Sequence, residues 1–167
     1  MAQELPIEQL LHFDKSTKEM LELIDTNDFD IFQIRKDTKE NELLTITTYI
    51  LHKHKVFKSL KISVEKYMSF ITKIQNGYKD VTYHNKTHGA DLSATAYLYL
   101  TKGEYWQKAA LDDIEFTAII VGGACHDHEH PGFNNVYLME TKDEIAIRYN
   151  DQSVLENHHV ASTFAIL

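Results

Sequence analysis

The sequence has little of three residue types that mark particular classes of protein. Its 167 residues include one cysteine, two prolines and six glycines. A single cysteine, Cys125, excludes an internal disulfide and is typical of a reducing compartment. So few prolines and glycines argue against a loop-rich or disordered chain. Because the length also suits one domain, we expect a single folded unit.

Long apolar runs and clusters of basic residues are also missing. No run approaches the roughly 20 apolar residues of a membrane span, and the N-terminal MAQELPIEQLLHF lacks the pattern of a secretory signal. The formal net charge is −8, so nucleic-acid binding, which needs clustered positive charge, is not expected. An acidic protein can still handle an anionic substrate if bound metal supplies positive charge. The expected location is the cytoplasm, and membrane association through a segment outside this sequence stays open.

Apolar residues recur at helical spacing along most of the chain. The segments that we expect to be helical are 14–24, 43–57, 63–77, 85–100, 109–124, 143–149 and 153–167. Their expected N-caps include Asp14 or Ser16, Ser63, and Asn85 or Thr87, and Gly77 is an expected helix end. Residues 29–34 fit a helical turn or a short strand, and 37–42 are typical of a polar loop. Few segments alternate as strands do, so the predicted fold class is all-α.

The most distinctive stretch is GGACHDHEHPG at 122–132, which follows the most apolar predicted helix. It places three histidines and two acids in five consecutive residues. An imidazole nitrogen from His126 and a carboxylate oxygen from Asp127 together suit zinc, manganese, iron or magnesium. The alternative is a histidine-rich surface turn, because a high local content of histidine does not by itself indicate a metal site.

The remaining histidines favour the metal interpretation. Of the ten histidines, seven follow residue 83. They fall into three clusters that each contain a carboxylate, around His84, His88 and Asp91, around 126–130, and around Glu156, His158 and His159. His84 and His88 are four residues apart and would share a face if both lay on one helix. Three such clusters indicate one shared polar pocket.

Several residues near these clusters have simpler interpretations. His52 and His54 are flanked by lysines, which disfavour a cation site, and fit a solvated helix end. His128 and Glu129 are expected to face solvent or to support the site only weakly. Cys125 fits a small buried residue. No role is predicted for two further histidines, His12 and His158.

Four segments carry a family resemblance. They are FDIF at 29–32, YHNKTHGAD at 83–91, HDHEHPG at 126–132 and YNDQSVLENHH at 149–159. In this order they resemble FDIF, YHNxxHAAD, HDxxHPG and YNDxSVLENHH of the class I 3′,5′-cyclic-nucleotide phosphodiesterases, within the wider HD metal-phosphohydrolase group. Gly89 stands where alanine is commoner, and Asn135 matches a downstream asparagine. The likeness runs from about residue 28 to residue 167.

The resemblance implies a metal-dependent hydrolase of signal transduction. It would convert cyclic AMP, cyclic GMP or both to nucleoside 5′-monophosphates, with a metal-bound hydroxide as nucleophile. Metal ligands would be His88, His126 and Asp127, with Asp127 bridging two divalent ions, zinc and magnesium or manganese.

The resemblance also implies roles around these ligands. His84 would be the general acid that protonates the leaving O3′, and Glu156 would orient its imidazole. The substrate-binding residues would be Tyr83, His84 and Asp127. His130 and Asn135 would support the site from outside the metal ligands.

The resemblance further implies a domain division. Residues 1–27 would be a helical lead-in, and residues 28–167 the N-terminal part of an all-α, HD-domain-like catalytic domain. The final HHVASTFAIL keeps an apolar helical pattern without a polar cap, so we expect the domain to be truncated at its C-terminal side. A further aspartate ligand and a purine-binding glutamine of the family have no counterpart here. Little turnover is therefore expected from these residues alone, and the alternative is a fragment that only binds metal or nucleotide. Nucleotide preference, regulatory domains and oligomeric state are not predicted.

Overall fold

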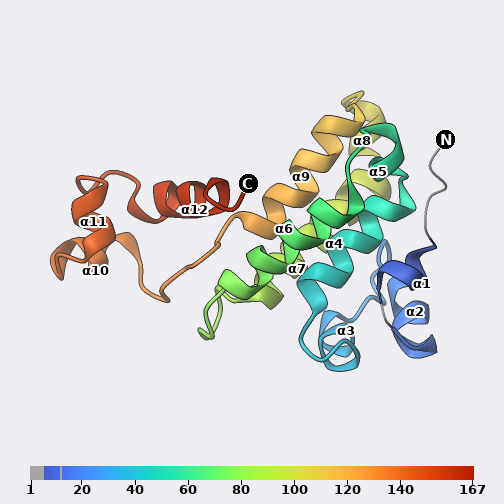
Figure 1. Ribbon diagram of the computed structural model, residues 1–167, viewed down its shortest axis with the longest axis horizontal. Helices are drawn as coiled ribbons and strands as arrows, with labels where there is room; N and C mark the ends of the chain where they lie inside the picture. Colours follow the sequence, from blue (N-terminus) through green and yellow to red (C-terminus); the bar gives the residue numbers. More distant parts are fainter. Residues whose placement is uncertain (1–5, 12) are drawn as a thin grey trace.

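A computed structural model describes residues 6–11 and 13–167, so His12 lies outside the described residues. In this part of the chain the secondary structure is helical, without a strand, as Figure 1 shows. The helices are α1 (Ile7–Leu10), α2 (Lys15–Glu22), α3 (Ile31–Asp37), α4 (Glu42–Lys53), α5 (Val56–Ser59), α6 (Val64–Gly77), α7 (Lys86–Thr101), α8 (Tyr105–Lys108), α9 (Asp113–Cys125), α10 (Asn135–Glu140), α11 (Glu144–Arg148) and α12 (Val154–Phe164). The all-α prediction is confirmed.

Helices α4, α7 and α9 pack on one another and form the centre of a bundle. Their shared core contains Leu43, Ile46, Ile50, Ala90, Ala94, Tyr97, Phe116 and Ile120. Two positions of α7, Ala90 and Ala94, carry only a methyl group and are at most 4% exposed. Such small side chains let neighbouring helices approach closely. This approach matters for function because α7 and α9 carry the first histidine clusters.

Polar side chains begin several helices where the sequence predicts them. Asp14 accepts a hydrogen bond from the amide of Thr17 at the start of α2. Ser63 accepts one from the amide of Lys66 in α6. Asn85 accepts two at the start of α7, one of them from the amide of His88. An N-cap satisfies amides that have no partner within the helix, so Asn85 fixes the first turn of α7, which carries His88.

The structure corrects two local predictions before residue 60. Glu42, expected in a polar loop, is the first residue of α4, is 0% exposed and accepts a hydrogen bond of 2.6 Å from Thr87 Oγ1. His54 is not a solvated helix end. Its Nε2 lies 2.9 Å from the hydroxyl oxygen of Tyr97, and its ring packs against Trp106 and Phe116. The chain turns after α4 and brings His54 inward, which local polarity does not reveal.

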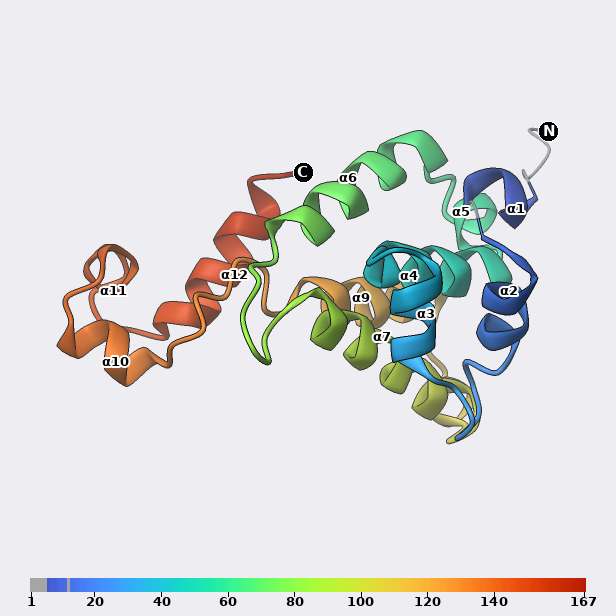
Figure 2. The ribbon, with the colours of Figure 1, turned by 90° about the horizontal axis from the view of Figure 1, so that it is seen from below.

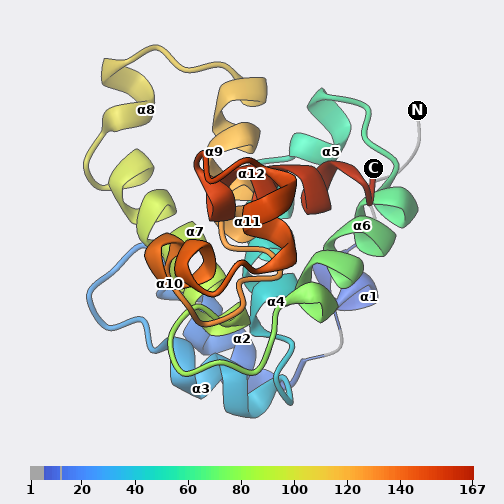
Figure 3. The same cartoon turned by 90° about the vertical axis from the view of Figure 1, so that its left-hand side faces the viewer.

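Helices α10 to α12 form what we call the C-terminal arm, residues 135–164. Figure 1 shows that α10 and α11 extend away from the bundle while α12 returns towards it, and Figure 3 views the arm in front of the bundle. The arm has a small core of its own, made by Leu138, Ala146, Val154 and Leu155. Helix α10 was not predicted, because its six residues are too few to show a clear helical period.

Helix α9 is central on one face only. Phe116 and Ile120 are fully buried, whereas Ile114 is 63% exposed and Ile119 38% exposed. A groove of about 520 Å³ lies beside α9, lined mainly by apolar side chains of α6, α9 and α12; these three helices are seen together in Figure 2. None of the helices in the described residues has the length and apolar character of a membrane-spanning segment.

Candidate metal centre

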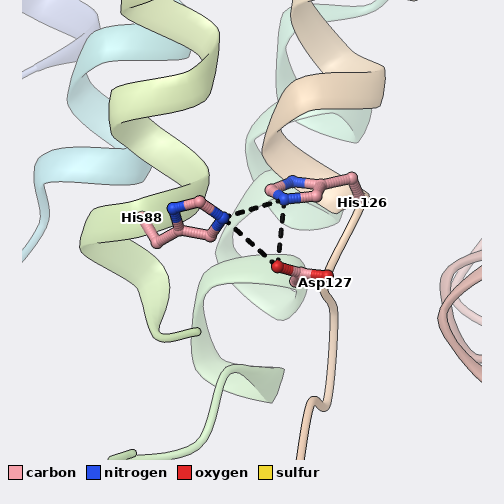
Figure 4. Close-up of side chains that lie close together, drawn as sticks. All are labelled: His88, His126 and Asp127. Atoms are coloured by element: carbon pink, nitrogen blue, oxygen red, sulfur yellow. Dashed lines mark hydrogen bonds and ion pairs between the residues drawn. The ribbon is translucent and has the colours of Figure 1, made fainter. Parts of the chain in front are cut away.

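Three predicted ligands meet where the end of α9 faces the start of α7. Helix α9 ends at Cys125, and His126 and Asp127 follow in the turn. The Nε2 atom of His126 is 3.0 Å from Asp127 Oδ2 and 3.1 Å from the Nε2 atom of His88. His88 Nε2 is in turn 3.3 Å from the same carboxylate oxygen. Figure 4 shows this triangle of side chains, which we call the first group.

The hydrogen bond on the far side of His126 decides what its ring offers to the first group. Its Nδ1 atom lies 2.8 Å from the carbonyl oxygen of Gly123. A carbonyl only accepts, so Nδ1 carries the proton and the neutral ring presents a lone pair at Nε2. That lone pair points at the Asp127 carboxylate and the His88 nitrogen. A proton on His88 or a cation would satisfy these converging atoms, and two imidazoles with a carboxylate are ligands that zinc accepts.

The charge states of the first group suit a cation. Burial alone would raise the pKa of Asp127, but the contact with His126, whose ring can become protonated, and the charge that neighbouring histidines can carry lower it to about 2. Burial lowers the pKa of His88, which keeps its ring neutral at pH 7. Burial also acts to lower the pKa of His126, but the contact with Asp127 raises it above its ordinary value overall. A proton therefore competes for the place that a metal ion would take.

The other oxygen of Asp127 faces a second set of side chains. Asp127, His130 and His159 form a further group whose potential ligand atoms lie within 4.8 Å of one another. His159 Nε2 is 3.6 Å from Asp127 Oδ1. We call these three residues the second group. One carboxylate thus belongs to two groups, the arrangement expected of a bridging ligand.

His130 takes part in the second group as a hydrogen-bond donor. Its Nδ1 accepts a hydrogen bond of 3.0 Å from the amide of Gly132, so the neutral ring carries its proton on Nε2. A protonated nitrogen cannot bind a metal directly but can donate to a water or an anion beside one. With this tautomer, Nε2 of His130 is a donor to such a water or anion.

His84 and Tyr83 lie beside the first group, ahead of α7. His84 precedes the N-cap Asn85, so it does not share a helix with His88. The two rings are nevertheless neighbours, with centroids 5.6 Å apart, and the ring of His84 stacks on that of His130 at 4.0 Å. Tyr83 is 64% exposed, and its ring lies 4.6 Å from that of His88.

Glu156 and Asn135 belong to the arm. The side-chain amide of Asn135 donates to Glu156 Oε2 at 3.1 Å, and its carbonyl oxygen accepts from the amide of Leu155 at 3.0 Å. The hydrogen bonds and ion pairs of the described residues do not join Glu156 to His84. Asn135 therefore fixes the start of α12, and through it the carboxylate of Glu156.

The remaining residues of the histidine clusters have different environments in the structure. His128, expected to face solvent or to support the site only weakly, is only 1% exposed, so the solvent-facing reading is wrong. His158 pairs with Glu129 at 3.0 Å. Cys125 is buried, as predicted, and burial raises its pKa to about 12. His159 received no role from the sequence, although it ends the distinctive segment at 149–159.

The fold and these groups define an all-helical protein with a paired histidine and aspartate centre suited to divalent cations. Comparison with known families agrees. The model of the family described as 3'5'-cyclic nucleotide phosphodiesterase matches residues 83–167, the range that holds both groups. The chain belongs to the 3′,5′-cyclic nucleotide phosphodiesterase family.

Curated relatives extend the match over most of the chain. A dual specificity calcium/calmodulin-dependent 3′,5′-cyclic nucleotide phosphodiesterase 1B of Mus musculus is 38% identical over 141 residues, which are 83% of this chain and 26% of the relative. The 3′,5′-cyclic-AMP phosphodiesterase 4 of Dictyostelium discoideum is 34% identical over 143 residues, 84% of this chain and 13% of the relative. The chain thus spans about a quarter or less of the length of these relatives.

Proposed function

We propose that this chain is the first part of a catalytic domain that hydrolyses 3′,5′-cyclic nucleotides, cyclic AMP or cyclic GMP, to nucleoside 5′-monophosphates. The observation that supports this most strongly is the convergence of His88, His126 and Asp127 inside the segment that matches the family. In this proposal residues 28–167 belong to the catalytic domain and residues 1–27 lead into it.

The proposed metals are zinc in the first group and magnesium or manganese on the Oδ1 side of Asp127. When bound, two such ions would neutralise the phosphate oxygens and lower the pKa of a coordinated water. The protein contributes a carboxylate that is ionised at neutral pH and the imidazole of His126, whose tautomer is set by the carbonyl of Gly123. Such outer hydrogen bonds orient the ligands before a metal arrives.

The proposed general acid is His84, which would give a proton to the O3′ of the ribose as the P–O bond breaks. Its ring lies against His130 and beside His88, next to the Asp127 centre. Glu156 is the proposed partner that holds His84 in its protonated form. This assignment is based on the family resemblance. Tyr83, largely exposed beside His88, would form part of the wall that receives the nucleotide.

The test measures bound metal and product in the same samples. The chain is stripped with chelator and reloaded with Zn²⁺ and Mg²⁺. Bound metal is quantified by mass spectrometry, and radiolabelled cyclic AMP and cyclic GMP are incubated long enough to detect slow turnover. We expect metal-dependent formation of the 5′-monophosphate. His84→Ala should retain the metal and lose most of the product, while Asp127→Ala should lose both.

The outcomes separate the alternatives. Metal binding without product from either nucleotide would assign the chain a binding role alone. A chain that binds no divalent ion would overturn the proposal, and an unchanged rate in His84→Ala would remove that residue as the acid. His158→Gln, which alters an arm histidine outside both groups, serves as the matched control and should behave as the wild type.

A further inference from the structure

The positive charge of this acidic chain is concentrated in one stretch. Residues 43–79 hold seven lysines and one acid, Glu65, and therefore carry a formal net charge of +6. Since the whole chain carries −8, the remaining residues together carry −14. No two of the seven lysines are adjacent in the sequence, so the stretch does not stand out there as a basic cluster.

Five of these lysines form what we call the lysine surface, on α5, its two flanking turns and α6. Its members, all exposed, are Lys55, Lys58, Lys61, Lys66 and Lys73. The amide of Lys58 donates to the carbonyl of Lys55 at 3.1 Å, and the amide of Lys61 donates to the carbonyl of Lys58 at 3.4 Å. Lys66 and Lys73 lie about two turns apart and share a face of α6. The folded chain therefore has a basic region, which corrects the expectation that clustered basic residues are missing.

The lysine surface lies at the outside of the bundle. Figure 2 shows α6 along one edge of the molecule and α5 beside the end where α6 begins. Helix α6 buries its other side, where Tyr67, Ile71 and Ile74 are at most 7% exposed. The packing of the core therefore leaves the lysine side chains free to meet a partner.

No acid neutralises the lysine surface. None of its ammonium groups forms an ion pair within the part of the chain that the structure describes, although Glu65 precedes Lys66 directly. Outside residues 43–79, by contrast, six of the ten lysines and arginines pair with an acid. These six are Lys15, Lys18, Arg35, Lys86, Lys102 and Lys108. Five like charges without partners repel one another, and an anionic partner would relieve that repulsion.

The composition of this region favours a lipid bilayer over a protein as the partner. Residues 43–79 contain no arginine, and the large hydrophobic side chains that are exposed in the described residues all lie outside this stretch. Protein interfaces are enriched in arginine and aromatic residues and depleted in lysine. A layer of anionic headgroups requires only positive charge within reach, and groups of about four to eight lysines or arginines bind such lipids.

The negative charge of the other residues determines the orientation of approach. An anionic bilayer repels residues that carry −14 in total, so attraction results only when the lysine surface faces the bilayer within about one Debye length, roughly 10 Å at 0.1 M salt. In Figure 1, α10 and α11 lie at the opposite side of the molecule from α5. The tip of the C-terminal arm would therefore point away from the bilayer.

We propose that the lysine surface binds anionic lipid bilayers and holds the chain peripherally at a membrane. The chemistry that it recognises is the negative charge of a headgroup such as that of phosphatidylserine. This inference goes beyond the proposed function and does not rest on it, because no residue of the metal centre takes part.

Vesicle flotation tests the proposal with the whole chain. A chelator is present, so that divalent ions cannot link acidic side chains to lipid. We expect binding to phosphatidylcholine vesicles that contain phosphatidylserine, and none to vesicles of phosphatidylcholine alone. Raising the salt from about 0.1 M to about 1 M should abolish binding, because the Debye length falls from about 10 Å to about 3 Å.

A triple variant removes the charges around α5. Lys55→Asn, Lys58→Gln and Lys61→Asn together should weaken binding by about 100-fold, since each lysine near an anionic bilayer raises affinity about fivefold. Asparagine replaces Lys55 and Lys61 because their φ angles are 57° and 55°, a region that asparagine tolerates. The helical circular dichroism and the unfolding midpoint should match those of the wild type.

The matched control removes three exposed lysines from other parts of the chain. Lys36→Gln, Lys39→Asn and Lys142→Asn change the net charge by the same amount. Lys39 and Lys142 also have positive φ angles, 52° and 54°, so the backbone demands are alike. This variant should lose less than about fivefold in affinity.

A polarity-sensitive dye locates the contact without removing a lysine. The one cysteine of the chain, Cys125, is buried, so a cysteine introduced at an exposed position takes the label selectively. Ser59→Cys places the dye in α5, and Thr141→Cys places it at the end of α10. With anionic vesicles, the emission should shift to the blue at residue 59 and stay unchanged at residue 141.

Several outcomes would overturn the inference. One is a wild type that does not bind anionic vesicles at low salt, and another is an equal loss in the two triple variants, since the bilayer would then sense only net charge. A dye shift of the same size at residues 59 and 141 would contradict the orientation. Binding of a polyglutamate peptide or of double-stranded RNA without binding of vesicles would assign the lysine surface to a protein or a nucleic acid instead.

Discussion

The Nε2 atoms of His88 and His126 lie 3.1 Å apart, although one residue begins α7 and the other follows α9. The proton of His126 is engaged by Gly123, so the two rings direct nitrogens of the same kind towards each other. A proton or a metal ion must lie between them. Four predictions follow from this contact and from other contacts of the bundle.

Zinc affinity of the first group should fall as the pH falls. The pKa of His126 lies above its ordinary value and that of His88 lies below it, so proton competition at His126 begins above pH ~6.5 and becomes stronger below it. Competition with a chelating dye at pH 8, 7 and 6 would measure this. His88→Ala should weaken binding at all three. Equal wild-type affinities at pH 8 and pH 6 would contradict the assignment.

Gly89→Ala should destabilise the protein, although alanine is the commoner residue in the motif that this segment resembles. A Cβ atom would lie 2.8 Å from Leu43 Cδ1 and 2.8 Å from the hydroxyl of Tyr78. Leu43 is fully buried, and that hydroxyl donates to the carbonyl of Ala124, so neither can move easily. Overpacking costs about 1–3 kcal/mol, which exceeds the helix gain of about 0.5–1 kcal/mol. Urea unfolding measures the net change.

Gly122→Ala is the matched control for that experiment. A Cβ atom there meets nothing within 4 Å, so only the gain in helix propensity remains, about 0.5–1 kcal/mol. The two glycines should therefore shift the free energy of unfolding in opposite directions. A stabilising effect at both positions would show that α4 and α7 can separate enough to admit a methyl group.

His54 should make the protein less stable as the pH falls. Burial, followed by the charge of Lys53, lowers the pKa of His54. The unfolded chain therefore binds a proton on this residue more readily, and stability is lost as the pH drops below about 6.5, the unfolded value. Unfolding midpoints between pH 7.5 and pH 5.5 should depend less on pH in His54→Phe than in the wild type. An identical pH dependence would remove His54 as a contributor.

Asn135→Ala should loosen the start of α12. Ser153 precedes this helix without a capping hydrogen bond from its side chain, and Asn135 supplies one to Leu155 from across the loop. Loss of a cap costs about 1 kcal/mol, and the amide of Leu155 should exchange with solvent faster. Asn134→Ala, which removes the cap of α10, is the control and should leave that amide protected. Unchanged exchange at Leu155 in Asn135→Ala would contradict the capping role.

Much of the bundle could be predicted from sequence because its signals are local. The side chains of Asn85, Ser63 and Asp14 accept hydrogen bonds from amides that follow closely in the sequence. The spacing of apolar residues indicates which face of each helix is buried. The clustering of histidines and acids also indicated one shared polar pocket, and the family resemblance named His88, His126 and Asp127, which the structure brings together. The tautomers of the histidines could not be predicted from the sequence, since each depends on which backbone group its ring contacts in the folded structure.

The errors concern residues whose environment is made by distant parts of the chain. His128 is polar and sits among charged neighbours, yet α6 and α12 close over it. Glu42 is buried because Thr87, from another helix, reaches its carboxylate. His54 is covered by α7, α9 and Trp106. No local pattern contains these contacts, so polarity alone suggested solvent in each case.

Asp127 contacts both the bundle and the C-terminal arm, because it belongs to the first group and to the second group. The first group lies between α7 and α9, which the bundle core keeps together, whereas His159 comes from α12 of the arm. The two groups around Asp127 therefore draw on both the bundle and the arm. A cation bound by residues of both groups would therefore stabilise the packing of the arm against the bundle, because binding favours the state that holds the ligand.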